Sequence, residues 1–395
     1  MTLIRVGRYN VCLRILNVLS ILFKFIINLI MPKIYNFGAG PAKMPEEVYE
    51  IIKKEFTDFE GTGISLLETS HRSGTYLKLN KDVQDVVRRL LNVPDNYKIL
   101  FMAGGGQGEF AAVPLNLISR TGTADYVVTG AWSAKAAKEA KKYGKVNLVT
   151  PPTDKYVDIP DQSKWNLDPN ASYIIIKNNN VTHSVEFDFV PDTKGVPLVA
   201  DMSSNFMSKR VDVSKFGVIY GGAQKNIGTS GVGLVIIRED LLNSVMPICP
   251  SLLDWTANAK ADSILNTPPM FAIYIMGRVL QWIERQGGLD VMAANATKKA
   301  STIYNIIEES NGFYYAPVAK NVRSKMNIPF RVGSPQGDEA LEKEFLKGAE
   351  AKRLIQLKGH RDVGGIRAST YNAVTLDEVN ALADYMREFY KKHAK

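Results

Sequence analysis

Two residues of this sequence have the type and setting needed for covalent chemistry on a carbonyl compound. Lys225 follows the apolar run Val218–Ala223 and precedes a glycine-containing loop, which is unusual for a solvated lysine. Asp201 ends a second apolar run that begins at Pro197. In α/β proteins, ligands bind at the carboxyl edge of the sheet, and we expect both side chains to lie there.

A lysine and an aspartate at one sheet edge are typical of pyridoxal phosphate sites. The amine can hold the aldehyde as an imine, and the carboxylate can keep the pyridine nitrogen protonated so that the ring accepts electrons. The same two residues would also suit an ordinary ion pair at a strand end. Considered alone, Lys225 and Asp201 leave both interpretations open.

Two other segments could help to hold such a ligand. The glycine-rich stretch Gly104–Gly108 follows an apolar run and precedes Glu109, so its N–H groups could face an anion at a helix start. Many glycine-rich turns have a purely steric role. Trp132 follows another expected strand, at the same edge, where its indole could stack on a flat ring or simply pack in the core.

Two histidines are followed directly by arginine, and a further arginine lies close to the second pair. The pairs are His71–Arg72 and His360–Arg361, and the additional residue is Arg367. Arginine is the preferred bidentate partner for carboxylate and phosphate groups. Each of these arginines could be a surface residue, but together they indicate a receptor for a substrate with more than one anionic group.

Alternation of apolar runs with amphipathic stretches predicts an α/β protein with one mostly parallel sheet. Seven runs are expected to be its strands: Lys98–Ala103, Asp125–Thr129, Val146–Thr150, Tyr173–Lys177, Pro197–Asp201, Phe216–Tyr220 and Val232–Ile237. The pattern changes near residue 290, where helices begin to surround a few short strands. We therefore expect a large domain over residues 33–290, whose first residues pack on a small domain over residues 291–395.

Composition limits the class of protein. The chain has 395 residues and a formal charge of +9, without the basic runs typical of nucleic-acid binding. Cys12 and Cys249 give no disulfide framework and no metal-ligand spacing, so we expect no metal and a reducing, cytoplasmic location.

Residues 1–32 form an N-terminal extension with three possible interpretations. It could be an organellar presequence over residues 1–30, a membrane anchor, or an optional segment upstream of a working start at Met31. A lysine at position 24 would be costly inside a membrane span.

From Asn36 to the C-terminus the chain resembles the phosphoserine aminotransferases, fold-type I pyridoxal phosphate enzymes of the class V aminotransferase group. The resemblance lies in these segments: Asn36–Ala42, Ser70–Ser73, Tyr126–Ala137, Asp201–Phe206, Gly222–Asn226, Asn266–Pro269, Ser324–Arg331, Lys358–Arg361 and Gly364–Ser369. It implies a large domain with a mostly parallel seven-stranded sheet and a smaller α/β domain.

The resemblance also implies a role for each matching residue. Lys225 would form the imine with pyridoxal phosphate, Asp201 would pair with the ring nitrogen, and Trp132 would stack on the ring. The cofactor phosphate would be held by Gly106, Gln107 and Gln224, and by Asn266 and Thr267 of a neighbouring subunit, so that a homodimer shares its active sites. Substrate anions would be bound by His71, Arg72, His360, Arg361 and Arg367, with Arg367 on the amino acid α-carboxylate.

The implied activity is ping-pong transamination between L-glutamate and 3-phosphohydroxypyruvate, giving 2-oxoglutarate and O-phospho-L-serine in serine biosynthesis. Two departures from the family pattern stand out. Val181 occupies the place of a threonine that contacts the cofactor, which Thr182 could replace after a one-residue shift, and Ala39 stands where proline is usual.

Alternatives to this activity remain. Alanine–glyoxylate transamination fits the paired His–Arg motifs poorly, and cysteine desulfuration lacks a convincing loop cysteine. A weakened paralogue retained for binding is the alternative from another class.

Overall fold

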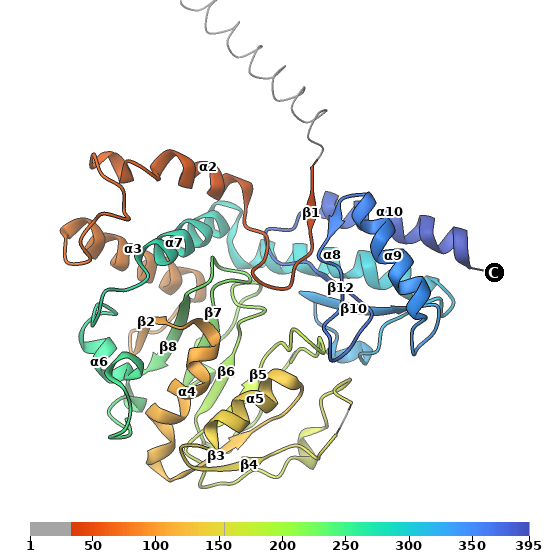
Figure 1. Ribbon diagram of the computed structural model, residues 1–395. Coiled ribbons are helices and arrows are strands. Elements are labelled where there is room, and N and C mark those ends of the chain that lie inside the picture. Colours follow the sequence, from red (N-terminus) through yellow and green to blue (C-terminus); the bar gives the residue numbers. More distant parts are fainter. Residues whose placement is uncertain (1–32, 154, 395) are drawn as a thin grey trace, which may run out of the picture.

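The computed structural model describes residues 33–153 and 155–394 and is built around one seven-stranded sheet (Figure 1). Its strands are β2 (Tyr97–Ala103), β3 (Thr123–Tyr126), β4 (Lys145–Leu148), β5 (Ile174–Lys177), β6 (Leu198–Asp201), β7 (Val218–Gly222) and β8 (Val232–Arg238). They lie in the order β2-β8-β7-β6-β5-β3-β4. Only β8 is antiparallel to its neighbours, β2 and β7. The expected α/β class and mostly parallel sheet are confirmed.

Both faces of the central strands β5 to β8 are buried, which explains why these strands are nearly continuous apolar runs, whereas the edge strand β4 is only partly buried. Alternate residues of β5 separate accordingly: Ile174 and Ile176 belong to one core, and Ile175 belongs to another. The first core includes helices α2 (Glu46–Glu55), α3 (Gly74–Leu91) and α7 (Met270–Arg285). The second includes α4 (Gly105–Leu117), α5 (Ala131–Ala140) and α6 (Trp255–Lys260).

The C-terminal part has a three-stranded antiparallel sheet in the order β12-β10-β9. Its strands and helices are β9 (Tyr314–Tyr315), β10 (Asn327–Val332), β12 (Ile366–Ser369), α8 (Gly288–Glu309), α9 (Glu339–Ala351) and α10 (Leu376–His393). Short 3₁₀ turns occur at Phe59–Gly61, Ile118–Arg120, Gln162–Lys164, Val213–Lys215, Glu239–Leu241, Ser251–Leu253 and Lys320–Val322. The C-terminal strands and helices, unlike these turns, surround a separate apolar core.

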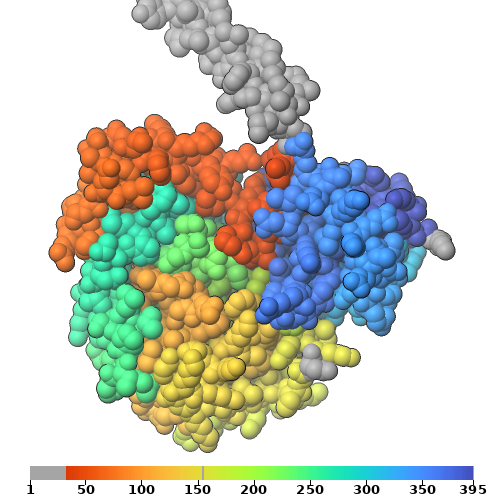
Figure 2. All heavy atoms as spheres, viewed as in Figure 1, coloured from red at the N-terminus to blue at the C-terminus, as the bar shows by residue number. Residues whose placement is uncertain are grey.

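The first described residues pack on this C-terminal core. Strand β1 (Tyr35–Asn36) pairs in parallel with β11 (Leu354–Ile355), and Phe37 is fully buried among C-terminal residues. Figure 2 shows this red segment against the blue C-terminal part. The expected domain boundary falls in the first turn of α8, where Leu289 still packs with the large sheet. The division itself stays a prediction.

Residues 1–32, including Cys12, lie outside the described part of the chain, and so do the three interpretations of that extension. Within residues 33–153 and 155–394, none of the helices combines the length and apolar character needed to cross a bilayer. The same residues contain no cluster of three histidine, cysteine or acidic side chains suited to a metal ion.

We predict that Phe37→Ala destabilises the protein strongly, because it removes a ring that is 0 % exposed in the C-terminal core. Large-to-small changes of this kind cost about 3–5 kcal/mol in the free energy of unfolding. Denaturant unfolding measures the effect. Phe56→Ala is the matched control, since Phe56 is 45 % exposed and loses mainly its edge-on contact with Phe271, which should cost no more than about 1.5 kcal/mol. Equal effects of the two changes would contradict the packing described here.

Candidate active site

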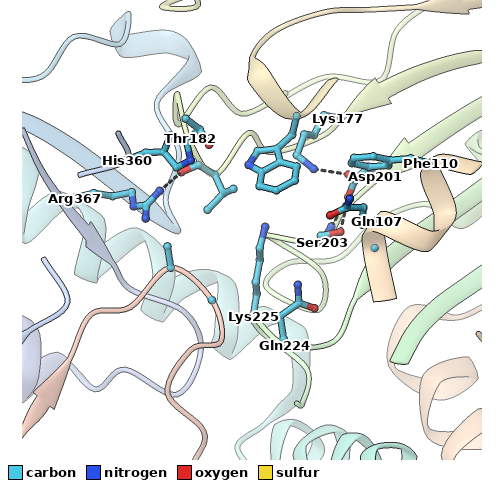
Figure 3. Close-up of a pocket in the computed structure, with 15 residues that line it drawn as sticks. Gln107, Phe110, Lys177, Thr182, Asp201, Ser203, Gln224, Lys225, His360 and Arg367 are labelled. Atoms are coloured by element: carbon cyan, nitrogen blue, oxygen red, sulfur yellow. Dashed lines mark hydrogen bonds and ion pairs between the residues drawn. The ribbon is translucent and has the colours of Figure 1, made fainter. Parts of the chain in front are cut away.

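A cavity of about 260 Å³ lies at the carboxyl ends of β5, β6 and β7, beside the C-terminal part (Figure 3). Many residues singled out from the sequence line it: Gly106, Gln107, Trp132, Thr182, Asp201, Gln224, Lys225, His360 and Arg367. They come from segments far apart in the chain. The sheet edge therefore gathers the amine, the carboxylate, the indole and an arginine around one space.

Lys225 lies in the loop between β7 and β8, and its side chain passes close to Gly40. A Cβ added at Gly40 would lie 3.0 Å from Lys225 Cγ, and Gly40 has φ +135°, so a larger residue is disfavoured there. Burial lowers the pKa of Lys225 to about 7. The charge of Lys177 and, more weakly, that of Arg367 act in the same direction, whereas Asp201 opposes them. A substantial fraction of the amine is neutral at neutral pH.

Asp201 ends β6 and is 3 % exposed. Its Oδ1 accepts hydrogen bonds from Ser203 N at 2.9 Å and from Ser203 Oγ at 2.6 Å. Its Oδ2 accepts one from the ammonium of Lys177, which ends the neighbouring strand β5. Burial alone would raise the pKa of Asp201, but Lys177 and Ser203 together hold it below its usual value. The carboxylate is therefore charged, and its direct cationic partner is Lys177.

The start of α4 forms one wall of the cavity and fits an anion. Gly106 and Gln107 lie in its first turn, where backbone N–H groups have no partner within the helix. A Cβ at Gly106 would lie 2.9 Å from Ser203 Oγ and 3.2 Å from Gly222 N, so only glycine lets the helix approach β7 this closely. Together with Gln224 on the facing loop, this cradle has the donors that a phosphate needs.

Trp132 and Thr182 also border the space. Trp132 lies in the first turn of α5, and its ring centroid is 6.4 Å from that of Phe110, which lines the same cavity. Thr182 is 1 % exposed, and its hydroxyl has no hydrogen-bond partner within the described residues. Such an unpaired buried hydroxyl is costly unless a ligand accepts or donates a hydrogen bond there. Both residues fit a flat, polar cofactor.

The residues near the C-terminus that were predicted to bind substrate anions divide into two groups. Arg367 on β12 and His360 line the cavity, and Arg367 Nη1 donates to the carbonyl of Val181 at 3.2 Å. Burial lowers the pKa of both side chains. Arg361 does not line the cavity, and its side chain is 87 % exposed to solvent.

Four other predicted residues lie together but away from the cavity lining of their own chain. They are His71, Arg72, Asn266 and Thr267. Thr267 Oγ1 is 3.4 Å from His71 Nδ1, which joins the two segments. Their roles stay predictions, and an isolated chain does not bring them to Lys225.

Comparisons with known proteins agree with this arrangement. Residues 34–382 match the family model described as aminotransferase class-V. A Drosophila melanogaster phosphoserine aminotransferase is 58 % identical over 361 residues, covering 91 % of this chain and 99 % of that protein. The chain belongs to the phosphoserine aminotransferase family.

Solved structures of the family have the same fold. A phosphoserine aminotransferase from Bacillus circulans subsp. alkalophilus has a TM-score of 0.88 at 42 % identity, covering 92 % of this chain and 99 % of the other. A pyridoxal phosphate-bound phosphoserine aminotransferase from Trichomonas vaginalis has a TM-score of 0.86 at 38 % identity, covering 90 % and 100 %. The fold around the cavity is therefore that of the aminotransferase family.

The two departures from the pattern of the phosphoserine aminotransferases are both at the cavity. Val181 lines it beside Thr182. Position 181 therefore lacks a hydroxyl group, but the hydroxyl of Thr182 could take its place. Ala39 also lines the cavity, and its carbonyl accepts a hydrogen bond from Tyr371 Oη at 2.9 Å. The replacement by Thr182 stays a prediction.

Two buried charged residues were not anticipated from the sequence: Lys177, which lines the cavity, and Glu109, which does not. Lys177 is the only charged residue of β5, and Glu109 is the only one of α4. A single charge in an otherwise apolar buried element was the available signal. Glu109 is 0 % exposed, and no ion pair balances its carboxyl group, whose one polar neighbour within the described residues is the indole of Trp255, too loosely placed for a well-formed hydrogen bond.

We predict that Glu109→Gln makes stability less dependent on pH. Burial raises the pKa of Glu109 from 4.5 to about 8 in the folded protein, so folding binds a proton between these values. This residue therefore makes the native state less stable as pH rises from 4.5 to 8. Thermal melting at pH 5 and pH 8 should show an advantage of Glu109→Gln that grows by a few kcal/mol towards the higher pH.

The control for this prediction is Glu68→Gln, which changes an exposed glutamate. Its melting temperature should follow that of the unaltered protein at both pH values. If the Glu109→Gln curve also runs parallel to that of the unaltered protein, Glu109 is not a buried neutral carboxyl.

Proposed function

We propose that this chain is a pyridoxal phosphate-dependent phosphoserine aminotransferase. It exchanges the amino group of L-glutamate and the keto group of 3-phosphohydroxypyruvate, giving 2-oxoglutarate and O-phospho-L-serine in serine biosynthesis. The observation that carries the proposal is the position of Lys225 in one cavity with Asp201 and Trp132 as well as Arg367. The family relationship supports the same assignment.

The cavity has a suitable residue for each part of the cofactor. Gly106, Gln107 and Gln224 would hold its phosphate, Asp201 its ring nitrogen, and Trp132 one ring face. When bound, the cofactor supplies an electron sink for the negative charge that develops on the substrate Cα.

Lys225 has the proton affinity that this chemistry needs. With a pKa of about 7, its Nζ can be neutral and can take the proton from the substrate Cα. It can then donate that proton to a different atom in the same site. Burial excludes water that would otherwise compete for that proton. Lys225 thus acts both as the attachment point and as the proton carrier.

Arg367 and His360 fit recognition of the acidic substrates. Both substrates carry an α-carboxylate, and the partly buried guanidinium of Arg367 can donate two parallel hydrogen bonds to such a group. Its bond to the Val181 carbonyl fixes the orientation of the fork. The second anion of each substrate would be met by the remaining basic residues, His71, Arg72, His360 and Arg361.

A homodimer with shared active sites is part of the proposal. His71, Arg72, Asn266 and Thr267 are clustered but do not line the cavity of their own chain. In a two-fold dimer, a cluster of this kind can complete the site of the other subunit. Asn266 and Thr267 would then contact the other subunit's cofactor phosphate.

Activity is predicted to require Lys225 and both substrates. Release of 2-oxoglutarate from glutamate should depend on 3-phosphohydroxypyruvate and fall at least about a hundredfold in Lys225→Ala, because the proton carrier is lost. The control is Lys215→Ala, which changes an exposed lysine. A folded, cofactor-loaded protein without turnover would overturn the assignment.

Mixed dimers are predicted to recover activity. Thr267→Glu places a carboxylate where the phosphate of the other subunit's cofactor is expected, and Lys225→Ala removes the amine. A hybrid of the two variants retains one intact site, so randomly paired subunits should regain roughly a quarter of the original activity. Steady-state turnover before and after subunit exchange measures this. No recovery in verified hybrids would contradict shared sites.

A further inference from the structure

The cavity contains a second amine, that of Lys177. This residue is 4 % exposed, ends β5, and lies directly opposite Asp201 in the strand register. Its ammonium donates a hydrogen bond to Asp201 Oδ2. Figure 3 shows its side chain reaching Asp201, while Lys225 enters the cavity from a different loop. Nothing in the proposed chemistry uses this buried ion pair.

Lys177 and Ser203 already donate three hydrogen bonds to the carboxylate of Asp201. Oδ1 accepts two hydrogen bonds from Ser203, at 2.9 and 2.6 Å, and Oδ2 accepts that of Lys177. The charge of the carboxylate is also balanced, because an ammonium lies in direct contact with it. In a buried setting such a contact is worth far more than in water.

The ring nitrogen of pyridoxal phosphate would need the same carboxylate. A protonated pyridine gains stabilisation from a carboxylate with a free oxygen and an unbalanced negative charge. Lys177 weakens both advantages, since its ammonium takes one acceptor site of Oδ2 and supplies a positive charge that already balances the carboxylate. Conversely, without cofactor an unpaired Asp201 would be a buried charge, and leaving such a charge unpaired is strongly destabilising.

We infer that Lys177 is a resident counter-ion of Asp201 that stabilises the cofactor-free protein and weakens its hold on pyridoxal phosphate. The inference rests on the proposed cofactor chemistry but adds a positioning residue that acts through Asp201. Lys177 thereby favours release of the cofactor, because the cofactor-free protein keeps Asp201 paired.

The test replaces Lys177 by methionine, which keeps most of the side-chain volume and removes the charge. Cofactor-free Lys177→Met should melt at a lower temperature than the unaltered protein, because Asp201 loses its partner. Its dissociation constant for pyridoxal phosphate should be at least about tenfold smaller, equivalent to about 1.4 kcal/mol. If the variant folds only with cofactor, release of pyridoxal phosphate from the loaded dimer into a scavenger should be slower than from the unaltered protein.

Two further variants separate charge pairing from packing. Lys177→Arg keeps the charge and should restore both the melting temperature and the affinity towards the original values. In an Asp201→Asn background, Lys177→Met should destabilise the cofactor-free protein much less, because the charge to be paired is gone.

A spectroscopic readout adds a property that a structural role would not change. The charged groups that act on the Lys225 amine are Lys177, Asp201 and Arg367. Removing the charge of Lys177 should therefore move the pH midpoint of the bound cofactor's visible absorbance upwards. Lys177→Arg should leave that midpoint near its original value.

Lys299→Met is the matched control for loss of a buried lysine. Lys299 is 3 % exposed and donates to the carbonyls of Tyr371 and Val374, at 2.7 and 2.8 Å, outside the cavity. This variant should lower stability without tightening cofactor binding.

The outcomes distinguish this inference from the proposed function. An unaltered protein that takes up no pyridoxal phosphate overturns the proposed function. An unaltered protein that binds it, with Lys177→Met binding no more tightly and releasing it no more slowly, overturns the role of Lys177 alone. Unchanged stability of cofactor-free Lys177→Met would also overturn that role.

Discussion

The active site depends on a negative charge that is kept inside the protein. Asp201 lies at the end of a parallel strand with apolar neighbours on both faces of the sheet, where an isolated carboxylate would take up a proton. The Ser203 hydrogen bonds and the Lys177 ammonium keep it ionised. The amine of Lys225 lies in the same cavity, and the Asp201 charge partly offsets the burial that lowers the pKa of this amine.

Close approach of backbone segments is the second constraint. The first turn of α4 touches the end of β7 only because Gly106 has no side chain, and the loop that precedes α2 reaches Lys225 only because Gly40 has none. These glycines shape the cavity wall without a side chain, and at Gly106 the backbone N–H stays open to a ligand. Their positions also explain why polar N–H groups and the lysine stem enter the cavity without intervening side chains.

The sheet and much of the cavity lining could be predicted from the sequence, whereas the electrostatics could not. Apolar runs identified all seven strands, most clearly in the centre of the sheet, where both faces are buried. The strand pattern also placed Lys225, Asp201 and Trp132 at one edge, and the resemblance then gave each a role. The partnership of Asp201 with Lys177 depends on strand register, and the neutral carboxyl of Glu109 depends on complete burial, so neither could be deduced from spacing alone.

The segment before α2 links the C-terminal core to the cavity at the edge of the large sheet. Phe37 is inserted in the C-terminal core, the Ala39 carbonyl is hydrogen-bonded to Tyr371, and Gly40 packs on the stem of Lys225. One wall of the cavity is therefore a strap anchored in the C-terminal core, while the opposite wall belongs to the large sheet. A small rotation of the C-terminal core against the large sheet would change the size of the cavity around the Lys225 amine. The hydrogen bonds within each sheet would stay intact.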